Sequence, residues 1–202
     1  MSKNLLIINS SPLSQGSKSR ALTDTFSKEW QNKNPDVIVI ERDLSKMGLG
    51  HLDEATIGAF FTPEDQLSDE QKELVALSNT LVAELIKADT IIIGAPMHNF
   101  SIPSTLKAYI DLIARAGKTF SYTEEGPKGH LGGKKVYVLS ASGGDYREGS
   151  PASGMNFIDP YLRTVFGFLG ITDVSFISAV NSAMGDEGLN EAQITLKRSI
   201  AA

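Results

Sequence analysis

A serine-rich segment near the N-terminus has the composition of an anion site. Serines occupy positions 10, 11, 14, 17 and 19, and Gly16 and Lys18 lie among them. A helix is expected to begin at the end of this segment, so its free amides and the positive end of its dipole would join the hydroxyls as donors. The segment therefore predicts a site for a phosphate monoester. The alternative is that the serines only cap the helix and solvate a loop.

A second segment, residues 94–103, mixes small, polar and apolar residues. Met97, His98, Asn99 and Phe100 form its centre. Exposed backbone groups, polar edges and apolar faces together suit a flat heteroaromatic ring. The alternative is an ordinary turn that buries Met97 and Phe100 in the core.

A third segment, residues 140–146, contains the glycine pair Gly143–Gly144. Paired glycines let a backbone approach a ligand closely, although the same pair also forms bare turns. The three segments matter together because each follows an expected strand.

Short apolar or β-branched runs alternate with longer amphipathic stretches, which is typical of βα units on a parallel sheet. The expected strands are 5–9, 37–43, 90–94, 135–140 and 173–179. We predict an α/β fold: a flavodoxin-like three-layer sandwich with a five-stranded parallel sheet and helices on both faces. Ligands of such sheets bind beyond the carboxyl ends of the strands, which is where the three segments lie.

Helices are expected between the strands, at 19–32, from Ser68 onward, from Pro103 to Gly117, at 160–169 and at 190–200. Ser68 and Gln71 form a capping box for the second helix, whose buried face is predicted to be Leu74, Leu77, Leu81 and Leu85. Residues 118–133 break the alternation and predict an inserted hairpin or loop near a site. Residues 1–202 are expected to form a single domain.

Composition excludes several classes of function. The 202 residues include no cysteine, so disulfides, thiolate metal sites and cysteine catalysis are ruled out. The formal net charge of -5 argues against binding nucleic acid or an anionic membrane through bulk charge. No apolar run is long enough for a signal peptide or a membrane span, so a cytoplasmic protein is expected.

Competing motifs are incomplete. The sequence Gly117-Lys118-Thr119 resembles the end of a P-loop, but Leu112 stands where that motif needs glycine. Neither GxGxxG after the first strand nor GxSxG is present. The three histidines lack metal-binding spacing, so no metal site is expected.

Several motifs together resemble the bacterial FMN-dependent NADH:quinone oxidoreductases and azoreductases. The similar residues run from the N-terminus to about residue 174. They comprise Ser10-Ser11, Ser17-Lys18-Ser19, Pro96-Met97-His98-Asn99-Phe100, Arg115-Ala116-Gly117-Lys118-Thr119-Phe120, Tyr122-Thr123-Glu124 and Gly126-Pro127.

The resemblance implies a homodimer with one FMN per subunit, which takes hydride from NADH at flavin N5 and passes two electrons to quinones or azo compounds by a ping-pong mechanism. No residue is assigned with certainty as catalytic, because FMN carries the chemistry. Phe100, Tyr122 and Phe166 are candidate walls for the substrate slot, with core packing as the alternative for Tyr122 and Phe166. The implied FMN contacts are Ser11, Ser17, Lys18 and Ser19 at the phosphate, and Met97, His98, Asn99, Phe100, Ala141, Ser142, Gly143 and Gly144 along the ring.

Two residues depart from the family pattern. His98 stands where the family commonly has tyrosine, and Ser142 stands where it commonly has arginine. Loss of a fixed cation near the ring predicts altered flavin tuning or acceptor preference. Two other functions remain open at this point: a flavin or nitro reductase of the same fold, and a non-enzymatic electron carrier.

Overall fold

The structure is a computed structural model that describes residues 3–201. Its main sheet has five parallel strands in the order β2-β1-β3-β6-β7, and β4 and β5 form a separate antiparallel hairpin. The strands are β1 Asn4–Asn9, β2 Ile38–Asp43, β3 Thr90–Pro96, β4 Phe120–Thr123, β5 Gly126–Gly129, β6 Lys135–Ala141 and β7 Asp173–Ala179. The five predicted strands of the parallel sheet are confirmed to within two residues at each end.

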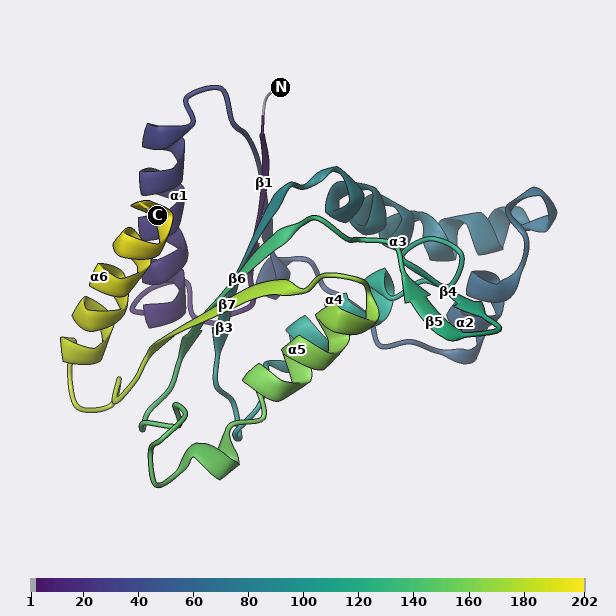
Figure 1. The fold of residues 1–202 in the computed structure, drawn as a ribbon. Coiled ribbons are helices and arrows are strands. Elements are labelled where there is room, and N and C mark those ends of the chain that lie inside the picture. The colour runs from purple at the N-terminus through teal and green to yellow at the C-terminus, as the bar shows by residue number, and fades with distance from the viewer. Residues whose placement is uncertain (1–2, 202) are drawn as a thin grey trace.

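Helices cover both faces of the sheet, with α1 and α6 on one side and α3, α4 and α5 on the other (Figure 1). The helices are α1 Lys18–Lys33, α2 Glu54–Phe61, α3 Asp69–Lys87, α4 Ser104–Ile113, α5 Asp159–Phe168 and α6 Glu187–Ala201. Three short 3₁₀ turns are η1 Leu44–Lys46, η2 Glu64–Gln66 and η3 Ser153–Met155. None of the helices within residues 3–201 is both long and apolar enough to cross a bilayer.

Strand alternation explains why the molecule has two hydrophobic layers. In β1, Leu6 and Ile8 join the layer under α3–α5, while Leu5 and Ile7 join the layer under α1 and α6. Successive side chains of a strand point to opposite faces, so a strand buried on both faces has a continuous apolar sequence. The predicted three-layer sandwich follows directly from this pattern.

The buried face of α3 differs from the prediction. The capping box at Ser68 is present. Leu81 and Leu85 are buried as predicted, but Leu74 and Leu77 are 39% and 40% exposed, and the helix buries Val75, Ser78 and Val82 in their place. A hydrogen bond explains this rotation of α3. The hydroxyl of Ser78 donates to the Leu112 carbonyl oxygen at 2.6 Å, which orients this side of α3 toward α4.

Helix α2 was not among the predicted helices. It is short, and Asp53 caps it by accepting a hydrogen bond from the Thr56 amide at 2.8 Å. Aspartate is a common helix N-cap, so the sequence contains a start signal for this helix but no clear indication of its eight-residue length.

Candidate functional site

A cleft of about 230 Å³ lies at the carboxyl edge of the sheet. Its walls come from the loop before α1, the end of β3, the loop after β6 and the loop after β7. The lining residues are Ser11, Leu13, Gly16, Ser17, Lys18, Ser19, Pro96, Met97, His98, Ala141, Ser142, Gly143 and Ser182. Parallel strands bring these distant segments together because all their carboxyl ends meet at one edge.

One end of the cleft is the N-terminus of α1. Ser17 is the N-cap, and its hydroxyl oxygen accepts a hydrogen bond from the Arg20 amide and lies 3.2 Å from the Ser19 hydroxyl. Within residues 3–201, the amides of Lys18 and Ser19 have no protein acceptor. Free amides, serine hydroxyls and the helix dipole therefore converge on one place, which is the arrangement that binds a phosphate.

The charged group of Lys18 is engaged elsewhere. Its Nζ forms an ion pair with Asp186, in the turn that leads into α6. Lys18 lines the cleft, but this ion pair neutralises its ammonium, and nothing in the local sequence indicated the pairing. The donors available to an anion are consequently mostly uncharged.

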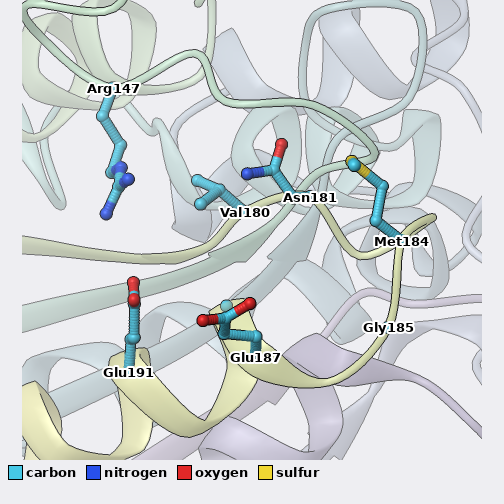
Figure 2. A pocket seen from close by; sticks show the side chains of 8 residues that line it. Arg147, Val180, Asn181, Met184, Gly185, Glu187 and Glu191 are labelled. Atoms are coloured by element: carbon cyan, nitrogen blue, oxygen red, sulfur yellow. The ribbon is translucent and has the colours of Figure 1, made fainter.

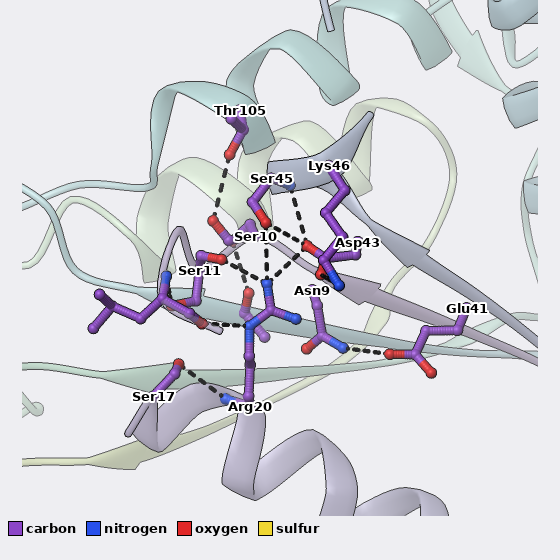
Figure 3. A network of polar contacts seen from close by, with 12 residues as sticks. Asn9, Ser10, Ser11, Ser17, Arg20, Glu41, Asp43, Ser45, Lys46 and Thr105 are labelled. Carbon is purple, nitrogen blue, oxygen red and sulfur yellow. Dashed lines mark hydrogen bonds and ion pairs between the residues drawn. The ribbon is translucent and has the colours of Figure 1, made fainter. Parts of the chain in front are cut away.

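Arg20 supports the serine loop from behind (Figure 3). Its Nε donates to the Leu13 carbonyl at 2.8 Å, and one Nη donates both to the Ser11 carbonyl and to Asp43 Oδ1 at 2.7 Å. Burial alone would raise the pKa of Asp43, but hydrogen bonds from Arg20 and Ser45 outweigh it and lower that pKa to about 2. The loop is thus held by a clamp that stays ionised at neutral pH.

The middle of the cleft is a backbone platform. The Met97 amide donates to the Ala141 carbonyl at 2.7 Å, which joins the end of β3 to the end of β6. After Met97 the chain reverses, with reciprocal hydrogen bonds between His98 and Ser101. Asn99 and Phe100 lie at the tip of this reversal with φ of 48° and 70° and do not line the cleft.

Phe100 is an aromatic residue in a left-handed backbone conformation, at a cost of roughly 1–2 kcal/mol. Its position is fixed by the neighbouring loop: its carbonyl accepts a hydrogen bond from the Phe157 amide, and its ring meets Tyr146 edge-on at 6.0 Å. Strain of this kind concentrates at functional sites. The turn projects a half-exposed phenyl ring beside the cleft.

The loop after β6 provides the far wall. Gly143 is exposed, and the amides of Gly143 and Gly144 have no acceptor within the described part of the chain. Ser142 points inward: it is 7% exposed, and its hydroxyl donates to the Gly144 carbonyl at 2.8 Å. Gly144 does not line the cleft itself.

Two predicted substrate residues lie elsewhere in the chain. Phe166 is 2% exposed and belongs to the hydrophobic core, so core packing, the alternative raised for it, accounts for its side chain. Tyr122 is 74% exposed on the β4–β5 hairpin. That hairpin packs near the start of β7, through the contact of Gly129 with Gly170, and Figure 1 shows it far from the loops after β3 and β6.

Several lining residues were not predicted. Leu13, Gly16 and Pro96 lie within or beside the predicted segments, whereas Ser182 follows the last strand, whose carboxyl end was not considered as part of the site. The position of Ser182 could have been predicted, because residues 181–182 directly follow a parallel strand, as the other three loops do. Arg20 could not have been found in this way, since its role depends on contacts with carbonyl groups.

A second hollow of about 290 Å³ lies beside the cleft, between the loop after β6 and the start of α6. Figure 2 shows Arg147 on one side and Glu187 and Glu191 on the helix opposite. The guanidinium of Arg147 is already paired with Asp145, which leaves two helix carboxylates facing this space. The hollow is therefore poorly suited to a phosphate, in contrast to the N-terminus of α1.

The sheet order and the cleft at its carboxyl edge define a flavodoxin-like α/β protein. A family model described as a flavodoxin-like fold matches residues 3–200. The chain is 55% identical over 188 residues to the FMN-dependent NADH:quinone oxidoreductase of Herminiimonas arsenicoxydans, covering 93% of this chain and 92% of the relative. It belongs to the family of FMN-dependent NADH:quinone oxidoreductases.

Other relatives support the same family assignment. The FMN-dependent NADH:quinone oxidoreductase of Hydrogenovibrio crunogenus is 48% identical, with 97% of this chain and 96% of the relative covered. Among solved structures, an FMN-dependent NADH-azoreductase of Bacillus anthracis in complex with FMN superimposes with a TM-score of 0.89 at 28% identity, covering 98% of both chains.

Proposed function

We propose that this protein holds FMN in the cleft at the carboxyl edge of the sheet and uses NADH to reduce quinones and azo compounds by two electrons. One observation carries the proposal: the free amides and serine hydroxyls at the start of α1 open onto the same cleft as the backbone platform of β3 and β6. The names of the relatives support the same activity.

The donor groups of the cleft fit FMN. The Lys18 and Ser19 amides and the Ser17 hydroxyl match a phosphate, while Pro96, Met97 and Ala141 supply a flat, mostly apolar wall for a ring. The Gly143 amide, which has no acceptor within the described residues, suits the polar edge of such a ring. These groups are neutral donors on short loops, so they can approach the ligand closely without repelling it.

When bound, FMN supplies the electron chemistry by accepting hydride from NADH and passing it on. The chain itself needs no acid–base pair: the Arg20 clamp fixes the phosphate loop, and the Gly143 amide would stabilise negative charge on the ring. The exposed side of the cleft next to Phe100 offers one face to flat molecules, so donor and acceptor would use it in turn. This is the ping-pong order.

We further propose that the active unit is a homodimer. Tyr122 cannot reach the cleft of its own chain, since Figure 1 shows the β4–β5 hairpin far from the loops after β3 and β6, which line the cleft. Large apolar side chains are exposed near the hairpin side of the molecule, on α2 and α3: Ile57, Phe61, Leu74 and Leu77. A second copy covering this surface would bury it and bring Tyr122 to the partner's cleft.

The proposed phosphate site is tested by placing a negative charge in it. Ser17→Glu should weaken FMN binding at least tenfold, because the carboxylate would occupy the site and repel the phosphate. Ser14→Glu is the matched control, since Ser14 is exposed on the same loop outside the cleft. Equilibrium titration of apoprotein with FMN measures both, and equal affinity for the two variants would remove this loop from the site.

Activity is tested separately by NADH oxidation in the presence of a quinone or an azo dye, with purified FMN-loaded protein alone. Rapid turnover without a partner protein is expected. A coloured protein that turns over neither acceptor would leave FMN binding intact but contradict the proposed reaction, and would favour an electron carrier.

A further inference from the structure

Lys18 stands at the junction of two hollows at the N-terminus of α1. One is the cleft of about 230 Å³, and the other, of about 280 Å³, lies between the first turns of α1 and α6. Gly16, Ser17 and Lys18 line both of them. Of the described residues that line the cleft, Lys18 alone carries a permanent charge. Its long side chain can turn toward either hollow without any movement of the α1 backbone.

The second hollow contains the carboxylate that engages Lys18. Asp186 lines this hollow and forms an ion pair with the Lys18 Nζ. Helices α1 and α6 pack side by side on one face of the sheet (Figure 1), and both follow strands at its carboxyl edge, which brings these two residues together. The side chains of Lys18 and Asp186 are 26% and 66% exposed. Exposed ion pairs contribute little to stability, so Lys18 can exchange partners at a small cost.

Asp186 has a second possible partner in helix α6 itself. Its carbonyl accepts a hydrogen bond from the Asn190 amide at 2.9 Å, which places Asp186 at the N-cap position. A carboxylate at that position commonly accepts a hydrogen bond from the amide of the second or third helical residue, here Gly188 or Leu189. Within residues 3–201, the hydrogen bond that its carboxylate accepts comes from Lys18 alone. The carboxylate therefore has a partner to take if Lys18 turns away.

We propose that Asp186 and the phosphate of FMN compete for Lys18, and that this competition sets how strongly the protein prefers FMN to a flavin without phosphate. The inference rests on the proposed function, because it requires the FMN phosphate to lie at the start of α1. Lys18 is the residue that determines specificity for the phosphate, and Asp186 is a positioning residue that acts through it.

The charges give the direction of the exchange. A phosphate monoester is more strongly charged than a carboxylate, so it is the better partner for an ammonium. When Lys18 turns into the cleft, it adds a charge-assisted hydrogen bond to the neutral amides and hydroxyls that meet there. Asp186 then caps α6. Each unit of FMN affinity gained from Lys18 is reduced by what the ion pair with Asp186 is worth.

Riboflavin is the matched ligand control, since it has the same ring and lacks the phosphate. Asp186→Asn should tighten FMN binding about two- to fivefold and leave riboflavin binding unchanged, because asparagine still caps α6 but no longer holds the ammonium. Asp24→Asn is the matched protein control: Asp24 is an exposed carboxylate on the same hollow and forms no ion pair within the described residues. Equilibrium titration of the apoproteins with each flavin measures these affinities.

A double-mutant cycle separates the proposed competition from simple repulsion between Asp186 and the phosphate. Lys18→Gln should weaken FMN binding about threefold or more. In that background, Asp186→Asn should change FMN affinity by less than about 1.5-fold, because no ammonium remains to be released. A carboxylate that acted only by repelling the phosphate would give the same shift in both backgrounds.

The proposal is supported if Asp186→Asn tightens the binding of FMN alone and does so only when Lys18 is present. It is overturned if Asp186→Asn leaves FMN affinity unchanged, tightens riboflavin binding equally, acts equally in the Lys18→Gln background, or is matched by Asp24→Asn. Each of these four results would leave the proposed function standing. Failure of the wild-type protein to bind FMN would instead overturn the proposed function, and this inference with it.

Discussion

Arg20 shows how a residue outside a cleft can set its geometry. It contacts the Ser11 and Leu13 carbonyls and Asp43, so the path of the serine loop depends on it. Arg20→Met should weaken FMN binding about tenfold, because the loop loses its support and the amides lose their alignment. Lys46→Met is the control: Lys46 also contacts Asp43, at 3.5 Å, but no loop carbonyl. Titration of apoprotein with FMN measures both, and equal losses would refute the clamp.

The same clamp predicts a pH dependence. The pKa of Asp43 is lowered to about 2 from an ordinary value of 3.8. A lowered carboxyl pKa stabilises the fold fully above about pH 4, and this contribution is lost as the pH falls from about 4 toward 2. Urea unfolding of wild type and Asp43→Asn should therefore differ most at neutral pH and converge near pH 2. A constant difference between pH 7 and pH 2 would contradict this linkage.

At Ser142, where the family resemblance suggests arginine as the common residue, the structure adds a constraint that the sequence did not reveal. Its hydroxyl is buried against the Gly144 carbonyl, so Ser142→Arg must lose that hydrogen bond, at about 1 kcal/mol, and turn its side chain outward. A cation near the ring should raise the midpoint potential of bound flavin, because it stabilises the anionic reduced ring. Potentiometric titration measures this, with Ser142→Met as the uncharged control. Equal shifts in both variants would rule out the charge as the cause.

Residue types and their place after strands were sufficient to place three serines at the end of the cleft where we propose that phosphate binds. Ser11, Ser17 and Ser19 all line it. The individual pairings were beyond prediction: Lys18 meets Asp186, 168 positions along the chain, and such a contact has no signature in local sequence.

Periodicity was informative for the helices that pack on the sheet, and ambiguous where two apolar stripes overlap. In α3 the sequence supports either the stripe of Leu74 and Leu77 or that of Val75 and Ser78. The buried stripe is the less hydrophobic one, because Ser78 bonds Leu112 and receives Arg115. A hydrogen bond between helices decided the rotation of α3, and apolar spacing alone could not reveal it.

The hairpin depends on a close backbone contact at Gly129. A Cβ built there would lie 2.1 Å from the Gly170 nitrogen, so Gly129→Ala must push the hairpin away from the start of β7, and we expect a loss of about 1–3 kcal/mol. Gly132→Ala is the control, because its nearest atom would be 3.6 Å away. Denaturant unfolding compares the two variants, and equal stability would show that the contact relaxes freely.

At the scale of the whole molecule, the proposed homodimer predicts complementation between damaged subunits. Ser17→Glu spoils a cleft and Tyr122→Ala spoils a hairpin, so each homodimer should be impaired. A mixed dimer contains one intact cleft facing one intact hairpin, and it should recover up to half of wild-type activity. Activity of purified mixed dimers measures this, whereas activity no higher than the mean of the two parents would refute a shared site.

The order of the strands also bears on how the chain is made. Strand β1 lies in the sheet between β2 and β3, and Leu5 pairs with Thr90, about 85 residues later. During synthesis, roughly 5 to 15 seconds separate the emergence of these two strands from the ribosome. During that time, one edge of β1 lacks its neighbouring strand. The fold therefore requires that this apolar strand be protected in the nascent chain, in addition to correct final packing.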